Sequence, residues 1–378
     1  MKKGTAPGRI AAFFKKEAVL CIAAILGIVS MFFVPPDAEY LHYPDYRVLA
    51  LLFCLMLVIA GLQEIGLFRY LGLRFLGKIR NTGELGLVLV ALCFFSSMFI
   101  TNDVALITFV PFSIMVLTMA GQRRMLIPVV VLQTIGANLG SMLTPIGNPQ
   151  NLYLYTAFEL PMGAFLGYML PLAALSLVLL VIAVLLTGRE PLSVASLERA
   201  EFPDRRKLTV YFLLFLVCLI CVLRLLPWPV MLGILILAVF FTDRGLFGKV
   251  DYFLLATFVC FFLFIGNVGR IPAVSSLLRE LIEGRELPAG VVLSQVISNV
   301  PAAILLSGFT ENARPLLYGV NVGGLGTLIA SLASVISYRL YGNSEGAGRG
   351  AYMKVFTLYN VIFLVILYIV AAGLLGYA

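Results

Sequence analysis

Long apolar blocks recur along the chain, separated by short polar or basic segments. Residues 49–60 (LALLFCLMLVIA) form one such block, and residues 172–186 form another. Apolar blocks of this kind, repeated along one chain, are typical of helices that cross a lipid bilayer. The pattern therefore predicts an all-α polytopic membrane protein. One of these spans, the last before the polar segment that starts at residue 189, is expected to begin at about Pro171.

Two apolar stretches carry a short polar interruption near the middle. The interruptions are Thr101-Asn102-Asp103 within residues 84–120 and Ser298-Asn299-Val300-Pro301 within residues 287–310. Basic residues flank the first stretch on both sides, which places both of its ends in the cytoplasm. Two full spans joined by a loop would satisfy this placement, and so would a re-entrant hairpin. The hairpin is favoured, because it gives the polar residues a purpose at membrane depth.

Two further stretches, residues 125–155 and 316–341, are rich in residues that break a helix. The first contains the run GANLGSMLTPIGNPQNLYLY, which includes Pro145, Gly147 and Pro149. Non-helical backbone is tolerated at membrane depth only where it is buried in protein or lines a water-filled cavity. Both stretches are therefore expected to be broken helices, and the breaks point to a binding site.

Composition and charge narrow the class of protein further. Of 378 residues, 61% are hydrophobic and 12% are charged, which excludes a water-soluble globule, a disordered chain and a nucleic-acid module. The net charge of +8 is attributed to Lys and Arg residues in cytoplasmic loops. The basic residues within 1–16 place the N-terminus in the cytoplasm. Residues 189–227 are expected to be a cytoplasmic linker and connecting helix. Lys249 falls in another inside loop, and Glu64 falls at the membrane interface.

The two halves share one order of elements and are predicted to be repeats, covering residues 1–188 and 228–378. The aligned residues are Asn102 with Asn299, Asn138 with Asn321, Gly140 with Gly323, and Thr144 with Thr327. Asn102 and Asn299 of the two hairpins are 197 residues apart, whereas Asn138 and Asn321 of the two broken helices are 183 residues apart. The difference indicates a shorter second hairpin arm, or a shorter connection after it, in the second half. The loop charges give the repeats opposite orientations. Inverted repeats with discontinuous helices are typical of secondary transporters.

Asp103 is the one carboxylate that the pattern places deep in the membrane, where an ionised Asp costs about 2.5–3.5 kcal/mol. It could serve a cation or a proton, or it could cap the second arm of the hairpin, and these roles are compatible. Asn102, Asp103, Asn148 and Asn299 are candidate Na⁺ ligands. All candidate substrate and ion ligands lie at the tips and breaks: Thr101, Asn102, Asp103, Asn138, Thr144, Pro145, Gly147, Asn148, Pro149, Asn151, Ser298, Asn299, Val300, Pro301, Asn321, Gly323 and Thr327.

At TNDVALITFVP, GANLGSMLTPIGNPQN and SNVPAAILL the chain resembles the ion transporter superfamily, which includes citrate and dicarboxylate transporters, arsenite efflux pumps and some sodium/proton antiporters. The resemblance implies a homodimer of scaffold and transport domains, one inward-opening and one outward-opening hairpin, and an elevator-like motion. In the divalent anion/sodium symporter branch, Ser-Asn-Thr motifs at the hairpin tips bind sodium and substrate. Here Asp103 and Val300 depart from that motif at its third position.

The branches of the superfamily suggest different substrates. The Asn-Asp pair of the first tip and the Asn-x-Pro of the second are similar to the arsenite branch, whereas residues 144–151 look more like the carboxylate branch. The expected function is secondary active transport of a small anion of the citrate or dicarboxylate type, coupled to Na⁺ or H⁺, in a bacterial-type inner membrane. Arsenite or oxyanion efflux, Na⁺/H⁺ antiport and a passive channel are the alternatives. No catalytic residue and no cofactor beyond the coupling ion are expected.

Overall fold

The computed structural model describes residues 17–76, 79, 81–188, 190 and 202–376, and this part of the chain is helical with no β-strand. The basic segment of residues 1–16 and most of the linker at 189–201 lie outside the described residues. Four 3₁₀ helices are η1 (Ala38–His42), η2 (Arg123–Met125), η3 (Arg244–Lys249) and η4 (Leu328–Ala330). The α-helices are α2 (Ala18–Met31), α3 (Tyr46–Glu64), α4 (Leu67–Leu76), α5 (Thr82–Ser96), α6 (Asn102–Met119), α7 (Leu126–Ser141), α8 (Pro149–Ala157), α9 (Met162–Leu185), α10 (Arg205–Val222), α11 (Trp228–Thr242), α12 (Tyr252–Gly269), α13 (Pro272–Ile282), α14 (Glu286–Ile297), α15 (Asn299–Ser307), α16 (Ala313–Val322), α17 (Leu332–Gly342) and α18 (Arg349–Leu375).

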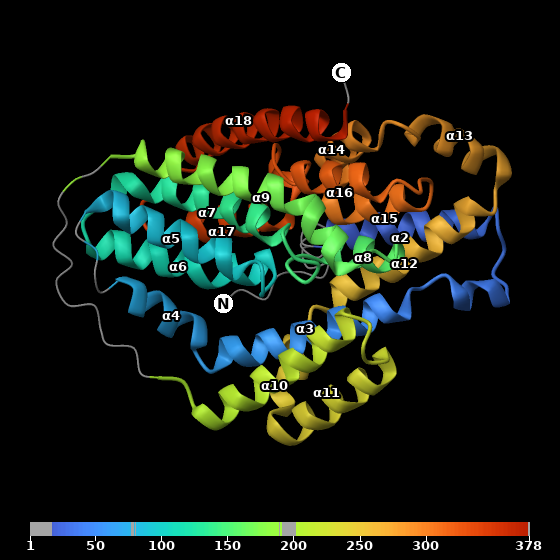
Figure 1. Ribbon diagram of the computed structural model, residues 1–378, viewed down its shortest axis with the longest axis horizontal. Helices are drawn as coiled ribbons and strands as arrows, with labels where there is room; N and C mark the ends of the chain where they lie inside the picture. Colours follow the sequence, from blue (N-terminus) through green and yellow to red (C-terminus); the bar gives the residue numbers. More distant parts are fainter. Residues whose placement is uncertain (1–16, 77–78, 80, 189, 191–201, 377–378) are drawn as a thin grey trace, which may run out of the picture.

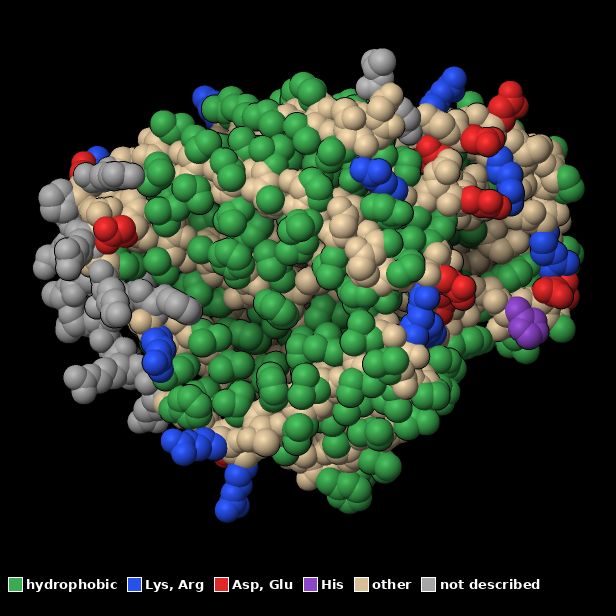
Figure 2. Space-filling model, in the orientation of Figure 1, with side chains coloured by type: hydrophobic (Ala, Val, Ile, Leu, Met, Phe, Trp, Pro, Cys, Tyr) green, Lys and Arg blue, Asp and Glu red, His purple; other side chains and the backbone are tan. Residues whose placement is uncertain are grey.

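Five of these helices, α3, α6, α9, α12 and α18, are long and apolar enough to cross a membrane. Hydrophobic side chains cover most of the face shown in Figure 2, whereas charged side chains gather toward its ends. This distribution fits a protein whose middle lies in lipid. The predicted all-α polytopic membrane fold is confirmed.

The helices form a larger bundle and a smaller group beside it (Figure 1). In the bundle, α7 packs against α5, α6, α9, α17 and α18. In the smaller group, α3 packs against α10, α11 and η3, and α2 packs along α12. The helix breaks and hairpin tips lie between these parts, because α8 contacts α3 and α15 contacts α12.

The series α3–α9 and the series α12–α18 have the same order of elements. Each begins with a long helix and continues with a short helix, a pair of helices, a broken helix and a last long helix. In each hairpin, the second arm begins at the tip asparagine. In the first hairpin this arm is α6, which begins at Asn102 and contains 18 residues, and in the second hairpin it is α15, which begins at Asn299 and contains 9 residues. At a rise of about 1.5 Å per residue, α14 and α15 are each far shorter than a hydrocarbon core of about 30 Å. These lengths suit a second hairpin that enters the membrane partway, whereas α6 of the first hairpin is long enough to cross it. The inverted orientation of the repeats stays a prediction.

One expected boundary is wrong. The last helix of the first half begins at Met162, and Pro171, which was expected near its start, lies inside it. Proline removes one backbone donor, but in membrane helices its neighbours satisfy the freed carbonyl. The proline was therefore a poor marker of the helix start.

Candidate transport site

The tip of the first hairpin is tied directly to the first broken helix. Between α5 and α6 the chain turns, and the Asn102 backbone N–H donates to the Gly147 carbonyl at 3.2 Å. The Asn102 side chain Nδ2 donates to Asn138 Oδ1 at 3.1 Å, and its Oδ1 accepts the Asp103 N–H at 3.0 Å. One asparagine thus joins the hairpin tip, the end of α7 and the break.

The break between α7 and α8 is closed by side chains. Asn148 caps α8 by accepting the Asn151 N–H at 2.9 Å, and its Nδ2 donates to Ser141 Oγ at 3.0 Å. Asn151 Nδ2 donates to the Met142 carbonyl at 3.1 Å. The Thr144 hydroxyl donates to the Met98 carbonyl in the first hairpin. The bonds to the Met142 and Met98 carbonyls satisfy acceptors just beyond the ends of α7 and α5, where the helices no longer supply a partner.

Glycine is required at the turn of this break. A Cβ on Gly147 would collide with the backbone of Ser141, and next to it Pro145 is buried. Pro149 then starts α8, a position where its missing N–H has no intrahelical partner to lose. The Gly and Pro residues of the motif therefore shape the break, and the amides around them supply its polar atoms.

The two halves of the chain meet at a chain of buried side chains. Asn321 Nδ2 donates to Asn151 Oδ1 at 2.7 Å, and Asn148 Nδ2 lies 3.4 Å from Asn321 Oδ1. Ser331 Oγ donates to Asn138 Oδ1 at 2.9 Å. We refer to the following residues as the central amide network: Asn102, Asn138, Ser141, Asn148, Asn151, Asn321 and Ser331.

The tip of the second hairpin has a different construction. Ser298 has φ +75° and ψ 154°, a conformation that non-glycine residues rarely adopt and that stores strain. Its hydroxyl lies 3.4 Å from the Ala330 carbonyl, and the neighbouring Asn299 is buried beside Gly324. Val300 and Pro301 line a small cavity of about 60 Å³.

The second break is held by a residue that the sequence did not single out. Gln295 Nε2 donates to the Gly323 and Leu325 carbonyls at 2.8 and 2.9 Å, and its Oε1 accepts the Thr327 N–H at 2.8 Å. Thr327 itself is exposed, so the structure does not bring it into the central amide network as it does Asn138 and Asn321. No motif marked Gln295, because a single glutamine in an apolar helix resembles many packing residues.

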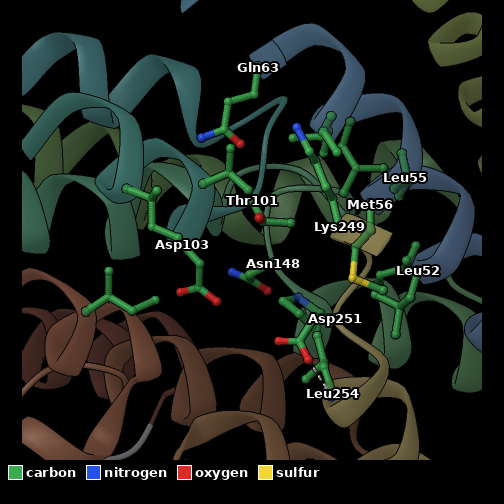
Figure 3. Close-up of a pocket in the computed structure, with 18 residues that line it drawn as sticks. Leu52, Leu55, Met56, Gln63, Thr101, Asp103, Asn148, Lys249, Asp251 and Leu254 are labelled. Carbon is green, nitrogen blue, oxygen red and sulfur yellow. Dashed lines mark hydrogen bonds between the residues drawn. The ribbon is translucent and has the colours of Figure 1, made fainter. Parts of the chain in front are cut away.

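A main cavity of about 320 Å³ opens beside the first hairpin tip and break (Figure 3). Four of the predicted residues line it: Thr101, Asp103, Asn148 and Pro149. Apolar residues of α3 form its opposite wall. The cavity therefore separates the hairpin and broken helix from the smaller helix group.

Three charged side chains line the main cavity. Asp103 Oδ1 is buried and has no hydrogen-bond partner among the described residues. Asp251 caps α12 by accepting the Leu254 N–H at 3.0 Å, and it also lines the small cavity. Lys249 forms an ion pair with Glu64. The lining thus holds two carboxylates and one ammonium group.

Asp251 and Lys249 were missed as site residues because charges in loops were attributed to topology. The available signal for Asp251 was its position directly before an apolar run, which is typical of a helix cap. Glu286, at the start of α14, is a further buried carboxylate and accepts hydrogen bonds from Thr310 and Asn312. Asp103 is therefore not the only carboxylate inside the protein.

The N-terminal ends of three helices face the main cavity: α6 at Thr101, α8 at Asn148 and α12 at Asp251. Helix N-termini carry a partial positive charge and attract anions. Carboxylate and amide oxygens beside them are ligands that suit hard cations such as Na⁺. No group of three or more His, Cys, Asp or Glu residues that could hold a metal ion occurs within the described residues.

The apolar helices, the broken helices and a cavity at their meeting point that holds charged and amide side chains in a mostly apolar wall define the class of an integral membrane transporter. Residues 10–314 match the citrate transporter family. This match covers most of the chain, so the chain belongs to the citrate transporter family, whose members are transporters and not enzymes.

Several curated relatives match most of the chain, and two of them are 32% identical to it. One is an uncharacterised transporter of Methanocaldococcus jannaschii, 32% identical over 312 residues, with 82% of this chain and 85% of the relative covered. The other is the inner membrane protein YbiR of Escherichia coli, 32% identical over 329 residues, with 84% and 86% covered. The crystal structure of the Alcanivorax borkumensis YdaH transporter has a similar fold, with a TM-score of 0.54, 15% identity and 99% of both chains covered.

Proposed function

We propose that this protein is a secondary active transporter that moves a small anion of the citrate or dicarboxylate type, coupled to Na⁺ or H⁺. The observation that carries the proposal is the main cavity, where the first helix break meets Asp103, Asp251 and Lys249. The family match supports an anionic substrate, because the family is described as citrate transporters.

Charge balance in the cavity supports coupling to a cation. With both carboxylates ionised, two negative charges and one ammonium group line the cavity, so its lining is then net negative. An anion entering this space is repelled until a cation or proton neutralises a carboxylate. The proposed order is therefore cation first at Asp103 and the nearby amide oxygens, and anion second.

The position of the cavity supports an elevator-type mechanism. The hairpins, broken helices, α9 and α18 are the proposed transport domain, and the proposed scaffold is built from α2, α3 and α10–α12. The cavity has residues of both groups in its wall, so a motion of one group against the other would alter its access. A homodimer in a bacterial-type inner membrane, with a cytoplasmic N-terminus, completes the proposal.

Uptake into proteoliposomes tests this function. Purified protein is reconstituted, and labelled citrate, succinate, phosphate and sulfate are offered under a sodium gradient and, separately, under a pH gradient. We expect saturable accumulation of at least one anion under one gradient. Equilibration without accumulation would instead indicate a passive channel.

A second candidate is cation/proton antiport, which the pair Asp103 and Asp251 favours because both are carboxylates on one cavity. The same vesicles, loaded with a pH-sensitive dye, test it: sodium-driven proton movement without any anion supports antiport. A third candidate is efflux of arsenite or another oxyanion. A silicon efflux transporter of Oryza sativa, 32% identical over 152 residues that cover 39% of this chain and 30% of that protein, is related to part of the chain.

A further inference from the structure

We propose that Lys249 is the residue that recognises the anion in the main cavity, and that Glu64 is an internal competitor that holds Lys249 when no anion is bound. This inference rests on the proposed function and names the group that binds the substrate. It concerns the ion pair between the end of α3 and the end of η3.

Lys249 is the only Lys or Arg among the described residues that line the main cavity. The other charged lining residues are carboxylates, and the amides of the break are largely committed to one another. An anionic substrate therefore has one side chain in this wall that offers it a full opposite charge. An ammonium group binds a carboxylate, phosphate or sulfate as a point charge.

The backbone that carries Lys249 is held in place. The rings of Phe247 and Phe53 stack with centroids 6.4 Å apart, and the Tyr252 hydroxyl donates to the Phe247 carbonyl at 2.9 Å. Asp243 caps the other end of η3 by accepting the Gly245 N–H at 3.0 Å. The Lys249 side chain can therefore change partner while its loop stays docked against α3.

Glu64 is a weakly placed partner for Lys249. It is the last residue of α3, where the negative end of the helix disfavours a carboxylate. The side chains of Lys249 and Glu64 are 49% and 43% exposed, and exposed ion pairs contribute little. A substrate carboxylate placed deeper in the cavity can displace Glu64, whose charge then returns to water.

Five variants test the role of this pair: Lys249→Gln, Lys249→Arg, Glu64→Gln, the double variant of Lys249→Gln with Glu64→Gln, and Lys207→Gln as the control. Lys207 is a matched lysine of the same region, 44% exposed and 3.9 Å from Asp243, and it lies outside the main cavity. Anion uptake into proteoliposomes gives KM and the maximal rate. The anion-induced shift in melting temperature of the purified protein gives binding without transport.

We expect Lys249→Gln to raise KM about tenfold or more, as for the loss of one charged hydrogen bond. Glu64→Gln should lower KM about two- to fivefold, because an exposed competitor is weak. The double variant should behave like Lys249→Gln alone, and Lys249→Arg should stay near the wild type. Lys207→Gln should leave KM unchanged.

Two results overturn the role of the pair while leaving the proposed function intact. One is a wild-type KM in Lys249→Gln with uptake still present; the other is a lower KM from Glu64→Gln that persists in the double variant. A wild-type protein that neither accumulates an anion nor is stabilised by one overturns the proposed function, and this inference falls with it.

Discussion

The tip of the first hairpin lines a cavity of about 320 Å³, whereas the tip of the second hairpin lines one of about 60 Å³. The first tip carries Asp103, and its break is closed by asparagines that bond across the two halves. The second tip carries Val300 at the position that aligns with Asp103, and its break is closed by Gln295.

The difference teaches that a shared order of helices does not imply shared chemistry. Both halves supply a tip asparagine and a tightly packed glycine, but only the first hairpin tip carries a carboxylate, and it lines the larger cavity, whereas Asp251 of the second half lines both cavities. The second half contributes Asn321 and Ser331, which bond to Asn151 and Asn138 of the first half. We infer that ion coupling belongs to the first half and that the second half completes its site.

The largest effect is expected at Asp103. Asp103→Asn keeps the shape of the side chain and removes the charge, so gradient-driven uptake should fall about hundredfold, the upper range for loss of a charged ligand. Uptake into proteoliposomes measures this loss. Elution of the purified variant at the wild-type position in size-exclusion chromatography is the control for folding. Uptake near the wild-type rate would contradict the claim that ion coupling depends on Asp103 of the first half.

The next effect is expected where the two halves meet. Asn321→Ala leaves Asn148 and Asn151 each short of a buried partner, and each loss is expected to cost about 1–3 kcal/mol. The melting temperature should fall clearly. Asn360→Ala is the matched control, because Asn360 is equally buried but donates only to the Phe356 carbonyl of its own helix. Equal losses in both variants would argue against a network that joins the halves.

The aligned glycines should behave alike. A Cβ on Gly140 would lie 2.7 Å from Ser97 Oγ and collide with the Phe94 carbonyl, and one on Gly323 would lie 2.9 Å from Ser294 Oγ. Alanine at either position should therefore destabilise the protein by about 1–3 kcal/mol. Thermal unfolding of the two variants measures this. If Gly140→Ala lowered the melting temperature and Gly323→Ala did not, the two halves would differ in their packing as well as in their polar side chains.

The smallest effect is expected at the aligned threonines. Thr144→Ala removes a hydroxyl that donates to the Met98 carbonyl, which is expected to cost about 0.5–1.5 kcal/mol. Thr327→Ala is at an exposed position and should stay within about 0.5 kcal/mol. Melting temperatures of the two variants check the order, and the reverse order would show that the Thr327 hydroxyl, which lies 3.3 Å from the Gln295 carbonyl, stabilises the second break.

The sequence predicted the helical membrane fold and the places where helices break, because apolar length and Gly/Pro density are local signals. It aligned Asn138 with Asn321, but it did not predict their partners, which are Asn102 and Ser331 for Asn138 and Asn148 and Asn151 for Asn321. It could not predict Asp251, Lys249 or Gln295 as cavity and break residues, because their roles depend on packing between helices far apart in the chain. Thr327 matched Thr144 in the alignment, yet the fold leaves it exposed.

Anion uptake by the wild type, Asp103→Asn and Ser298→Ala, each with and without an imposed cation gradient, tests most directly the claim that coupling belongs to the first half. The ratio of uptake with and without the gradient is the quantity to measure. The account predicts a high ratio for the wild type and Ser298→Ala, and a ratio near one for Asp103→Asn. A high ratio in Asp103→Asn together with a ratio near one in Ser298→Ala would contradict it.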